Sequence, residues 1–99
     1  MISELEKLEE VKIILENNKI EDEGVIYLAE IKFDKLKKLK SFQLNLNNNH
    51  INYYGAATLI SKLSDLENKE VKLSLTNHLM DKEETKEIRR IARNVELEM

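Results

Sequence analysis

Apolar residues alternate with mostly polar ones in three short segments of the chain. The apolar positions are Val11, Ile13 and Leu15; Phe42, Leu44 and Leu46; and Val71, Leu73 and Leu75. A period of two is typical of a β-strand that buries one face. A helical period follows the second segment, at Gly55, Leu59, Leu63 and Leu66, and the same stripe begins after the first, at Gly24, Leu28 and Ile31. The pattern predicts three strand–turn–helix units.

These units repeat in register along the chain. An offset of 31 residues places Asn18 over Asn49, and a third copy follows after 29 residues with His78 in that slot. A repeat of this length predicts a solenoid, and its strands are parallel because each unit returns the chain to the same edge. We therefore predict one domain over residues 1–99, with a capping helix at 1–10, repeats at about 11–41, 42–70 and 71–94, and a terminal strand at 95–99.

The spacing of the repeat resembles that of a known family. Between Leu39 and Leu59 apolar residues stand at 42, 44, 46 and 51, asparagine at 49 and glycine at 55, and the run from Leu8 to Leu28 matches position for position. This pattern resembles leucine-rich repeats of the ribonuclease-inhibitor-like type, in a form similar to ciliate repeats, since Asn, Lys and Ile make up 33 of the 99 residues. The resemblance implies an α/β fold, a short solenoid of about three β–α coils with a concave parallel sheet and helices on the outer arc. It also implies a habit of binding proteins.

Asparagine and glycine have physical roles in such a repeat. Asn18 and Asn49 lie where the backbone leaves the sheet, so a side-chain amide can bridge adjacent coils there. In the third copy a neutral His78 also offers one donor and one acceptor. Gly55 and its counterpart in the first copy provide space where the turn approaches the neighbouring coil. Glu84 takes the glycine slot in the third copy and is hard to bury, so we expect that coil to be exposed on its far side.

Composition and charge exclude several classes of protein. The chain contains no cysteine, which excludes disulfides, thiol catalysis and thiolate metal sites. A net charge of −3 gives no overall attraction to nucleic acid or to an anionic membrane. The segment from Ile2 to Glu9 has no apolar run that could act as a signal or a membrane anchor. We expect a cytoplasmic protein with no membrane partner; a cytoskeletal, ciliary or nuclear location is also compatible.

Known catalytic motifs are absent from the sequence. It has no glycine-rich phosphate loop, no Gly-x-Ser-x-Gly turn and no His-Glu-x-x-His pair. His50 and His78 belong to successive coils with Asp81 nearby, but a metal would need a further ligand. A structural role explains His78 more simply. We therefore predict a protein that is not an enzyme and that holds no cofactor and no metal.

Three regions are candidates for binding a protein partner. Strand residues pointing away from the core form three polar rows: Lys12, Gln43 and Lys72; Ile14, Asn45 and Ser74; and Glu16, Asn47 and Thr76. Tyr53 and Tyr54 lie in the predicted loop that leaves the sheet; at least one should be exposed and could anchor a partner, although both could equally just cover the helix start. Val95, Leu97 and Met99 alternate with glutamates, which predicts a last strand with an unpaired edge.

The predicted function is non-catalytic protein–protein interaction, or a structural subunit of a larger assembly. The partner could bind end-on through the C-terminal coil, and self-association is an option. One alternative is a regulator or inhibitor of an enzyme such as a nuclease or a kinase. Another is an RNA-binding subunit of a ribonucleoprotein, which would use a local cluster of lysines: Lys32, Lys35, Lys37, Lys38 and Lys40. The net charge favours this last alternative least.

Overall fold

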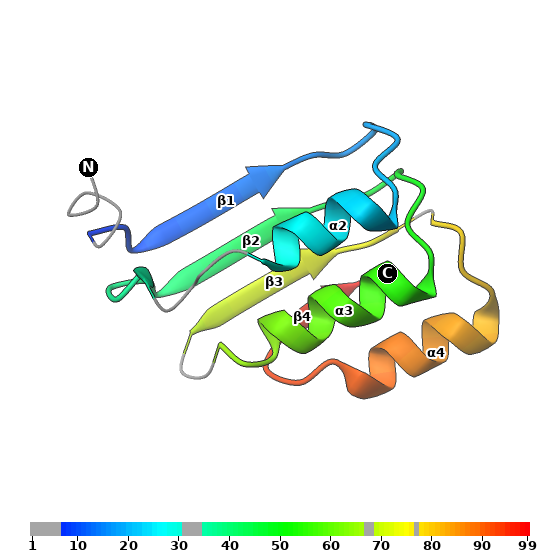
Figure 1. Cartoon of the computed structure of the whole chain (residues 1–99). Helices are drawn as coiled ribbons and strands as arrows, with labels where there is room; N and C mark the ends of the chain where they lie inside the picture. Colours follow the sequence, from blue (N-terminus) through cyan, green and yellow to red (C-terminus); the bar gives the residue numbers. More distant parts are fainter. Residues whose placement is uncertain (1–6, 31–34, 67–68, 77) are drawn as a thin grey trace.

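The chain forms a four-stranded parallel sheet whose strands are connected, one to the next along the chain, through helices (Figure 1). The computed structural model describes residues 7–30, 35–66, 69–76 and 78–99. Its elements are β1 (Glu10–Ile14), α2 (Asp22–Ala29), β2 (Ser41–Asn45), α3 (Tyr53–Leu63), β3 (Glu70–Ser74), α4 (Lys82–Ile91) and β4 (Glu96–Glu98). The strand order is β1-β2-β3-β4, which follows the order in the sequence. The predicted α/β class and parallel sheet are therefore confirmed.

The three strands predicted from the repeat pair in the predicted register. Val11 lies opposite Phe42, and Phe42 lies opposite Val71, so equivalent residues of the three units form continuous rows. The strands end one residue before the last apolar position of each segment. The ladder nevertheless continues, because the Leu15 N–H donates to the Asn45 carbonyl at 2.8 Å and the Leu46 N–H to the Ser74 carbonyl at 3.0 Å.

Asparagine residues turn the chain away from the sheet after the first two strands. Asn17 and Asn48 occupy equivalent positions and have φ angles of 62° and 58°. These values lie in the left-handed region, which asparagine tolerates better than most residues. The chain then crosses to the helical layer, and each helix runs back over the sheet. The predicted asparagine-rich turns are confirmed.

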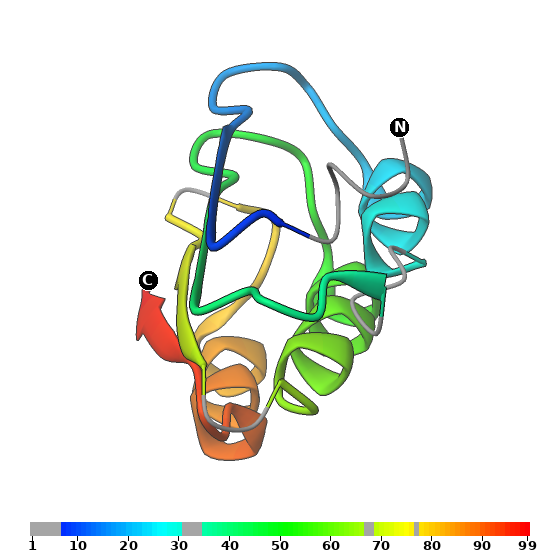
Figure 2. The same cartoon turned by 90° about the vertical axis from the view of Figure 1, so that its left-hand side faces the viewer.

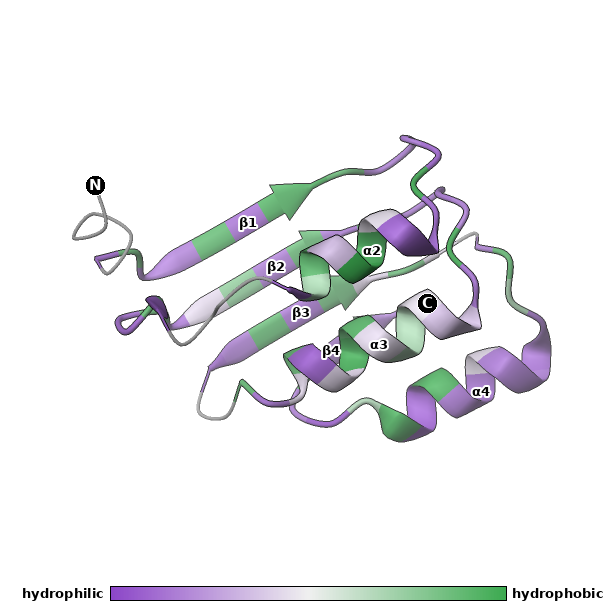
Figure 3. Ribbon diagram, in the orientation of Figure 1, coloured by the Kyte–Doolittle hydropathy of each residue, from purple (hydrophilic) through white to green (hydrophobic). Residues whose placement is uncertain are grey.

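The three described helices lie together on one face of the sheet, as the turned view shows (Figure 2). Helix α2 packs beside α3, and α3 packs beside α4. Hydropathy alternates along the strands, so that apolar and polar residues occupy opposite faces (Figure 3). The apolar face lies under the helices, and no described helix covers the other face.

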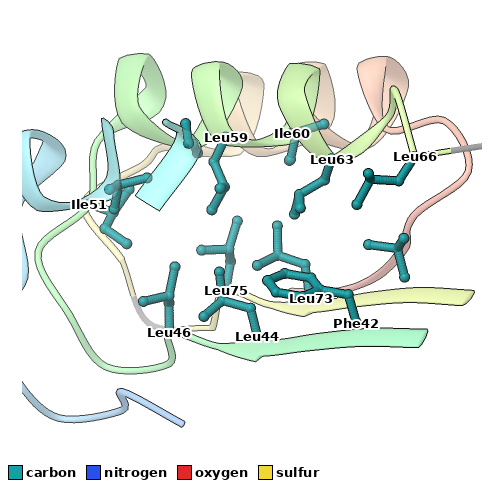
Figure 4. Packing of buried hydrophobic residues seen from close by; sticks show 14 of the residues in the cluster. Phe42, Leu44, Leu46, Ile51, Leu59, Ile60, Leu63, Leu66, Leu73 and Leu75 are labelled. Carbon is teal, nitrogen blue, oxygen red and sulfur yellow. The ribbon is translucent and has the colours of Figure 1, made fainter. Parts of the chain in front are cut away.

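The core lies between α3 and the two central strands. Phe42, Leu44 and Leu73 point from the sheet toward Leu59 and Leu63 of α3, and each of these side chains is 3% exposed or less (Figure 4). Burial of one such side chain contributes about 1.5–3 kcal/mol. The corresponding side chains of β1 are only half-buried, because no described strand lies beyond it.

The structure confirms a fourth strand near the predicted place. The sequence predicted residues 95–99, and β4 comprises Glu96–Glu98 with Leu97 opposite Leu73. Asn94 turns the chain into this strand with a φ angle of 59°. Its side chain also donates to the Ser64 carbonyl at 3.2 Å, which ties this turn to the end of α3.

The predicted N-terminal capping helix lies mostly outside the described residues. Residues 1–6 belong to that part of the chain, and Lys32 of the lysine cluster does so too. Residues 7–9 form a turn and an irregular segment instead of a helix, and Glu10 is already the first residue of β1. The prediction is therefore wrong for residues 7–10. The pairing of Glu10 with Ser41 draws this part of the chain into the sheet.

Candidate protein-binding surface

The uncovered face of the sheet carries rows of polar side chains over an open groove. The register places Lys12, Gln43, Lys72 and Glu96 in one row and Ile14, Asn45, Ser74 and Glu98 in the next. These residues line a shallow groove of about 590 Å³. Parallel sheets usually have both faces covered. An open polar face on such a sheet is therefore a candidate binding surface.

Carboxylates gather at the β4 side of this groove. Lys72 Nζ lies 3.6 Å from Glu96 Oε2 and 4.0 Å from Glu70 Oε1, and all three side chains are substantially exposed. Exposed ion pairs of this kind add about 0–1 kcal/mol to stability. The rows predicted from the sequence ended at Lys72, Ser74 and Thr76 and missed Glu96 and Glu98. The alternation that predicted the last strand held the signal for both.

Two asparagines predicted to contact a partner also hold the fold together. Asn47 Oδ1 accepts the Thr76 N–H at 2.8 Å, across the junction between the second and third coils. Asn45 Oδ1 accepts the Asn47 N–H at 3.0 Å within its own turn. Their side-chain oxygens are thus engaged inside the protein. Gln43 and Ser74 line the groove as well.

Asn49 joins the first two coils beside this surface. Its side chain is 2% exposed. Oδ1 accepts the N–H groups of Asn18 and Ile20, both at 2.9 Å, and Nδ2 donates to the carbonyls of Leu15 and Leu46, also at 2.9 Å. Leu15, Asn18 and Ile20 belong to the first coil. The predicted bridge between coils is therefore confirmed for Asn49.

The same role is wrong for Asn18. Its side chain is exposed and donates to the Glu16 carbonyl at 3.0 Å, within its own turn. The reason is positional, because the equivalent Asn49 reaches back to the preceding coil. Among the described residues no coil precedes that of Asn18.

His78 occupies the corresponding place between the second and third coils, as predicted. Its Nδ1 accepts the Ile51 N–H at 3.3 Å, the counterpart of the bond from Ile20 to Asn49. Nδ1 is therefore the unprotonated nitrogen, and Nε2 carries the ring hydrogen. Nε2 is buried and makes no hydrogen bond of normal geometry within the described residues. The His78 imidazole thus takes the place of an asparagine amide such as that of Asn49, but it makes fewer hydrogen bonds.

The environment of His78 favours its neutral form. Burial lowers the pKa of its imidazole below the ordinary value of 6.5, and the carbonyl groups of Leu46 and Asn49 partly oppose this shift. A positive charge on nearby His50 lowers it further. Only the neutral ring can accept the Ile51 N–H, so the shift and the structural role agree.

Gly55 marks a close approach of the first two coils. A Cβ atom there would lie 2.4 Å from Asp22 Oδ1 and 3.1 Å from Asp22 Cα. That Oδ1 is held in place by accepting the Asn52 N–H at 2.7 Å. The predicted role is confirmed for Gly55. At Gly24 a Cβ atom would meet Ile20 Cγ2 at 2.9 Å, so that glycine serves packing inside its own coil.

Glu84 stands in the glycine slot of the third coil and caps a helix there. Its Oε1 accepts the Asp81 N–H at 3.1 Å, and Asp81 Oδ1 accepts the Glu84 N–H at 2.8 Å. This reciprocal pair is a capping box at the start of α4. Sequence reasoning missed it, although an aspartate followed three residues later by glutamate is its usual signal.

The two adjacent tyrosines differ in environment. Both are the first residues of α3, so the prediction that they lie in a loop is wrong. The asparagine turn is short enough for the helix to begin at Tyr53. Tyr54 is 67% exposed, whereas Tyr53 is half-buried and packs against the core. Tyr27 of α2 is a further exposed aromatic residue that the sequence did not single out.

The last strand and the lysine cluster lie at different strands, because β4 ends the sheet order and the described lysines precede β2. Val95, Leu97 and Met99 are half-buried and pack against the core, and Arg89 Nη2 donates to the Met99 carbonyl at 3.2 Å. The cluster members in the described part lie before β2 and are exposed: Lys35, Lys37, Lys38 and Lys40. Lys40 pairs with Glu9 at 3.1 Å. Acidic residues thus offset part of the basic charge.

The described residues contain neither a cluster of metal-ligating side chains nor a helix that could span a membrane. No three histidine, aspartate or glutamate side chains there come together in a group that could hold a metal ion. None of the described helices combines the length and apolar composition needed to cross a bilayer. Comparisons of the chain with models of protein families, with curated proteins and with solved structures found no match.

Proposed function

We propose that this chain is a short solenoid of the leucine-rich-repeat type that acts as a non-catalytic protein-interaction or structural subunit. The observation that carries the proposal is the uncovered polar face of its parallel sheet. Two features support the repeat assignment. Equivalent residues of the three units share rows in the sheet, and Asn49 and His78 fill equivalent places between successive coils.

The chemistry of the groove favours a protein partner that brings hydrogen-bonding groups. Gln43, Lys72 and Ser74 are half-buried and stand on strands whose backbones are paired on both sides. Their backbones are therefore held in place before binding, which lowers the entropy cost of association. Glu96 and Glu98 add negative charge on one side. A loop or extended segment with a basic side chain toward β4 fits this surface best.

A matched pair of serine variants tests the location of the surface. Ser74→Arg places a long charged side chain in the groove, whereas Ser61→Arg places the same side chain on the exposed surface of α3. We expect affinity capture from source cells to lose specific partners with Ser74→Arg and to keep them with Ser61→Arg. Equal circular dichroism and melting of both variants must accompany this result. Partners lost with Ser61→Arg alone would place binding on the helical layer and overturn the proposal.

Salt dependence separates this proposal from nucleic-acid binding. A contact with a partner through mainly uncharged groups should weaken little between low and moderate salt, whereas binding through phosphate contacts should weaken steeply. Capture of RNA with a steep salt dependence, lost on neutralising Lys35, Lys37 and Lys38, would contradict binding through the groove.

A further inference from the structure

The outer edge of β1 presents backbone groups that no described strand pairs. The Leu15 N–H donates to the Asn45 carbonyl, so residues in phase with Leu15 face β2. Backbone groups of alternate residues in a strand point to opposite sides. The N–H and C=O groups of Lys12 and Ile14 therefore point away from the sheet. In the strand order no described strand lies beyond them.

The outer edge of β4 is its counterpart at the other end. The Glu98 carbonyl accepts the Leu75 N–H at 2.8 Å, so Glu98 and Glu96 direct their backbone groups toward β3. By the same alternation, the groups of Leu97 point outward. An edge of this kind can pair with another chain. One end of the sheet thus offers the groups of Lys12 and Ile14, and the other those of Leu97.

Both ends also leave apolar core positions partly uncovered. Val11, Ile13 and Leu15 at one end and Val95, Leu97 and Met99 at the other are half-buried. Their equivalents in the two central strands are at most 3% exposed: Phe42, Leu44, Leu46, Val71, Leu73 and Leu75. Within the described residues, each end therefore has no neighbouring strand that would cover the same rows, and the two ends match one another row for row.

We propose that a second copy of this chain binds end to end, with β1 of one copy pairing in parallel with β4 of the other. The sheet register sets the alignment. Lys12, Gln43, Lys72 and Glu96 share one row, so a continued sheet places Lys12 of the second copy beside Glu96 of the first. Inside one chain, Lys72 already lies 3.6 Å from Glu96 in the same relation.

Charge supports this alignment over others. Charged residues on an edge strand usually discourage pairing. Here the edge charges have opposite sign, and the register puts them in one row. Pairing β1 with β1, or β4 with β4, would not bring Lys12 to Glu96. The contact joins two different surfaces, so it builds rings or chains of copies, and the mass rises with concentration. The pairing uses the outer strand edges, whereas binding in the groove uses the open face of the sheet, which Lys12 and Glu96 also line.

Charge reversal tests the contact in purified protein. Sedimentation velocity should show the wild-type mass rising above the monomer value of 11.6 kDa as concentration increases. Lys12→Glu alone places two carboxylates together, and Glu96→Lys alone places two ammonium groups together, so each variant should remain monomeric. An equimolar mixture of the two should associate again, because every junction then joins opposite charges.

Three results would overturn the proposal. A wild-type chain that stays at monomer mass up to millimolar concentration excludes the contact. Association of Lys12→Glu alone that equals wild type excludes the register. Ile14→Pro tests whether the backbone of β1 makes the contact. It removes the N–H of residue 14, which points away from the sheet, and Ile14 is 56% exposed, so the change should be tolerated in the monomer. We expect this variant to melt as wild type does and to remain monomeric; wild-type association of a folded Ile14→Pro chain would exclude strand pairing.

Discussion

Replacement of Asn49 by alanine tests the junction between the first two coils. The change removes a side chain that bonds four backbone groups at 2.9 Å. A buried backbone group without a partner costs about 1–3 kcal/mol, so simple addition would give about 4–12 kcal/mol. Only the bond to Leu46 is fully buried, and water can reach the others. We therefore expect a loss of about 2–4 kcal/mol.

Asn18→Ala is the matched control. It removes the same amide from the equivalent slot, where the side chain is exposed and makes one local bond. Surface changes of this kind usually alter stability by less than about 0.5 kcal/mol. Urea unfolding followed by circular dichroism measures both variants. For a domain of this size, the expected loss for Asn49→Ala corresponds to a melting temperature lower by roughly 10–30 °C.

Asn49→Asp separates lost hydrogen bonds from lost volume. The carboxylate keeps the shape of the side chain and can still accept from Asn18 and Ile20, but it cannot donate to Leu15 or Leu46. We expect its free energy of unfolding at neutral pH to lie well below that of wild type. Equal denaturation midpoints for Asn49→Ala and Asn18→Ala, or a wild-type midpoint for Asn49→Asp, would refute the reasoning.

Three further predictions concern His78, the contact between Gly55 and Asp22, and the two adjacent tyrosines. The folded state lowers the pKa of His78 below 6.5, so the unfolded chain binds the proton more readily, and the free energy of unfolding should fall as pH drops below about 6.5. Unfolding measured at pH 7.5 and 5.5 should show a smaller fall for His78→Asn than for wild type. Gly55→Ala gains about 1 kcal/mol of helix propensity, but it forces Asp22 to move, which costs about 1–3 kcal/mol. We therefore expect Gly55→Ala to lower the free energy of unfolding, and Asp22→Ala to relieve part of this loss. A Gly55→Ala variant more stable than wild type would contradict the contact. Tyr54→Ala should leave melting nearly unchanged, whereas Tyr53→Ala should lose roughly 1–2 kcal/mol; equal melting curves would show that the two environments do not differ.

Sequence pattern predicted those parts of the fold that repeat. Period-two alternation fixed the strands because a strand has only two faces, and the offset between copies fixed their register. Asn49 was predictable for the same reason, since its slot recurs. Asn18 was not, because a bridging residue needs a preceding repeat unit, and none precedes that of Asn18 among the described residues. Position in the array, not residue type, separates the two asparagines.

The candidate surface was only partly predictable. Two of the three predicted rows were correct as far as Lys72 and Ser74, and the sheet adds Glu96 and Glu98. The third row, Glu16, Asn47 and Thr76, lies beyond the ends of the strands. The periodicity of apolar residues does not show at which residue a helix begins after a turn, so Tyr53 was placed in a loop. The capping role of Glu84 was not predicted, because Glu84 was compared with the glycines at the same position of the other copies and not with Asp81, three residues before it.

The spacing of the bonds between coils bears on the rate at which the chain folds. Ladder bonds of Asn49 join residues 29, 31 and 34 apart, and that of His78 joins residues 27 apart. Each junction therefore closes a loop of about one repeat, at nearly the same entropic cost. Folding rate depends on such separations more than on length in small domains. Inserting a duplicate of residues 42–70 should thus leave the refolding rate, measured by stopped-flow, nearly unchanged; a fall of several orders of magnitude would show that folding depends on contacts beyond adjacent coils.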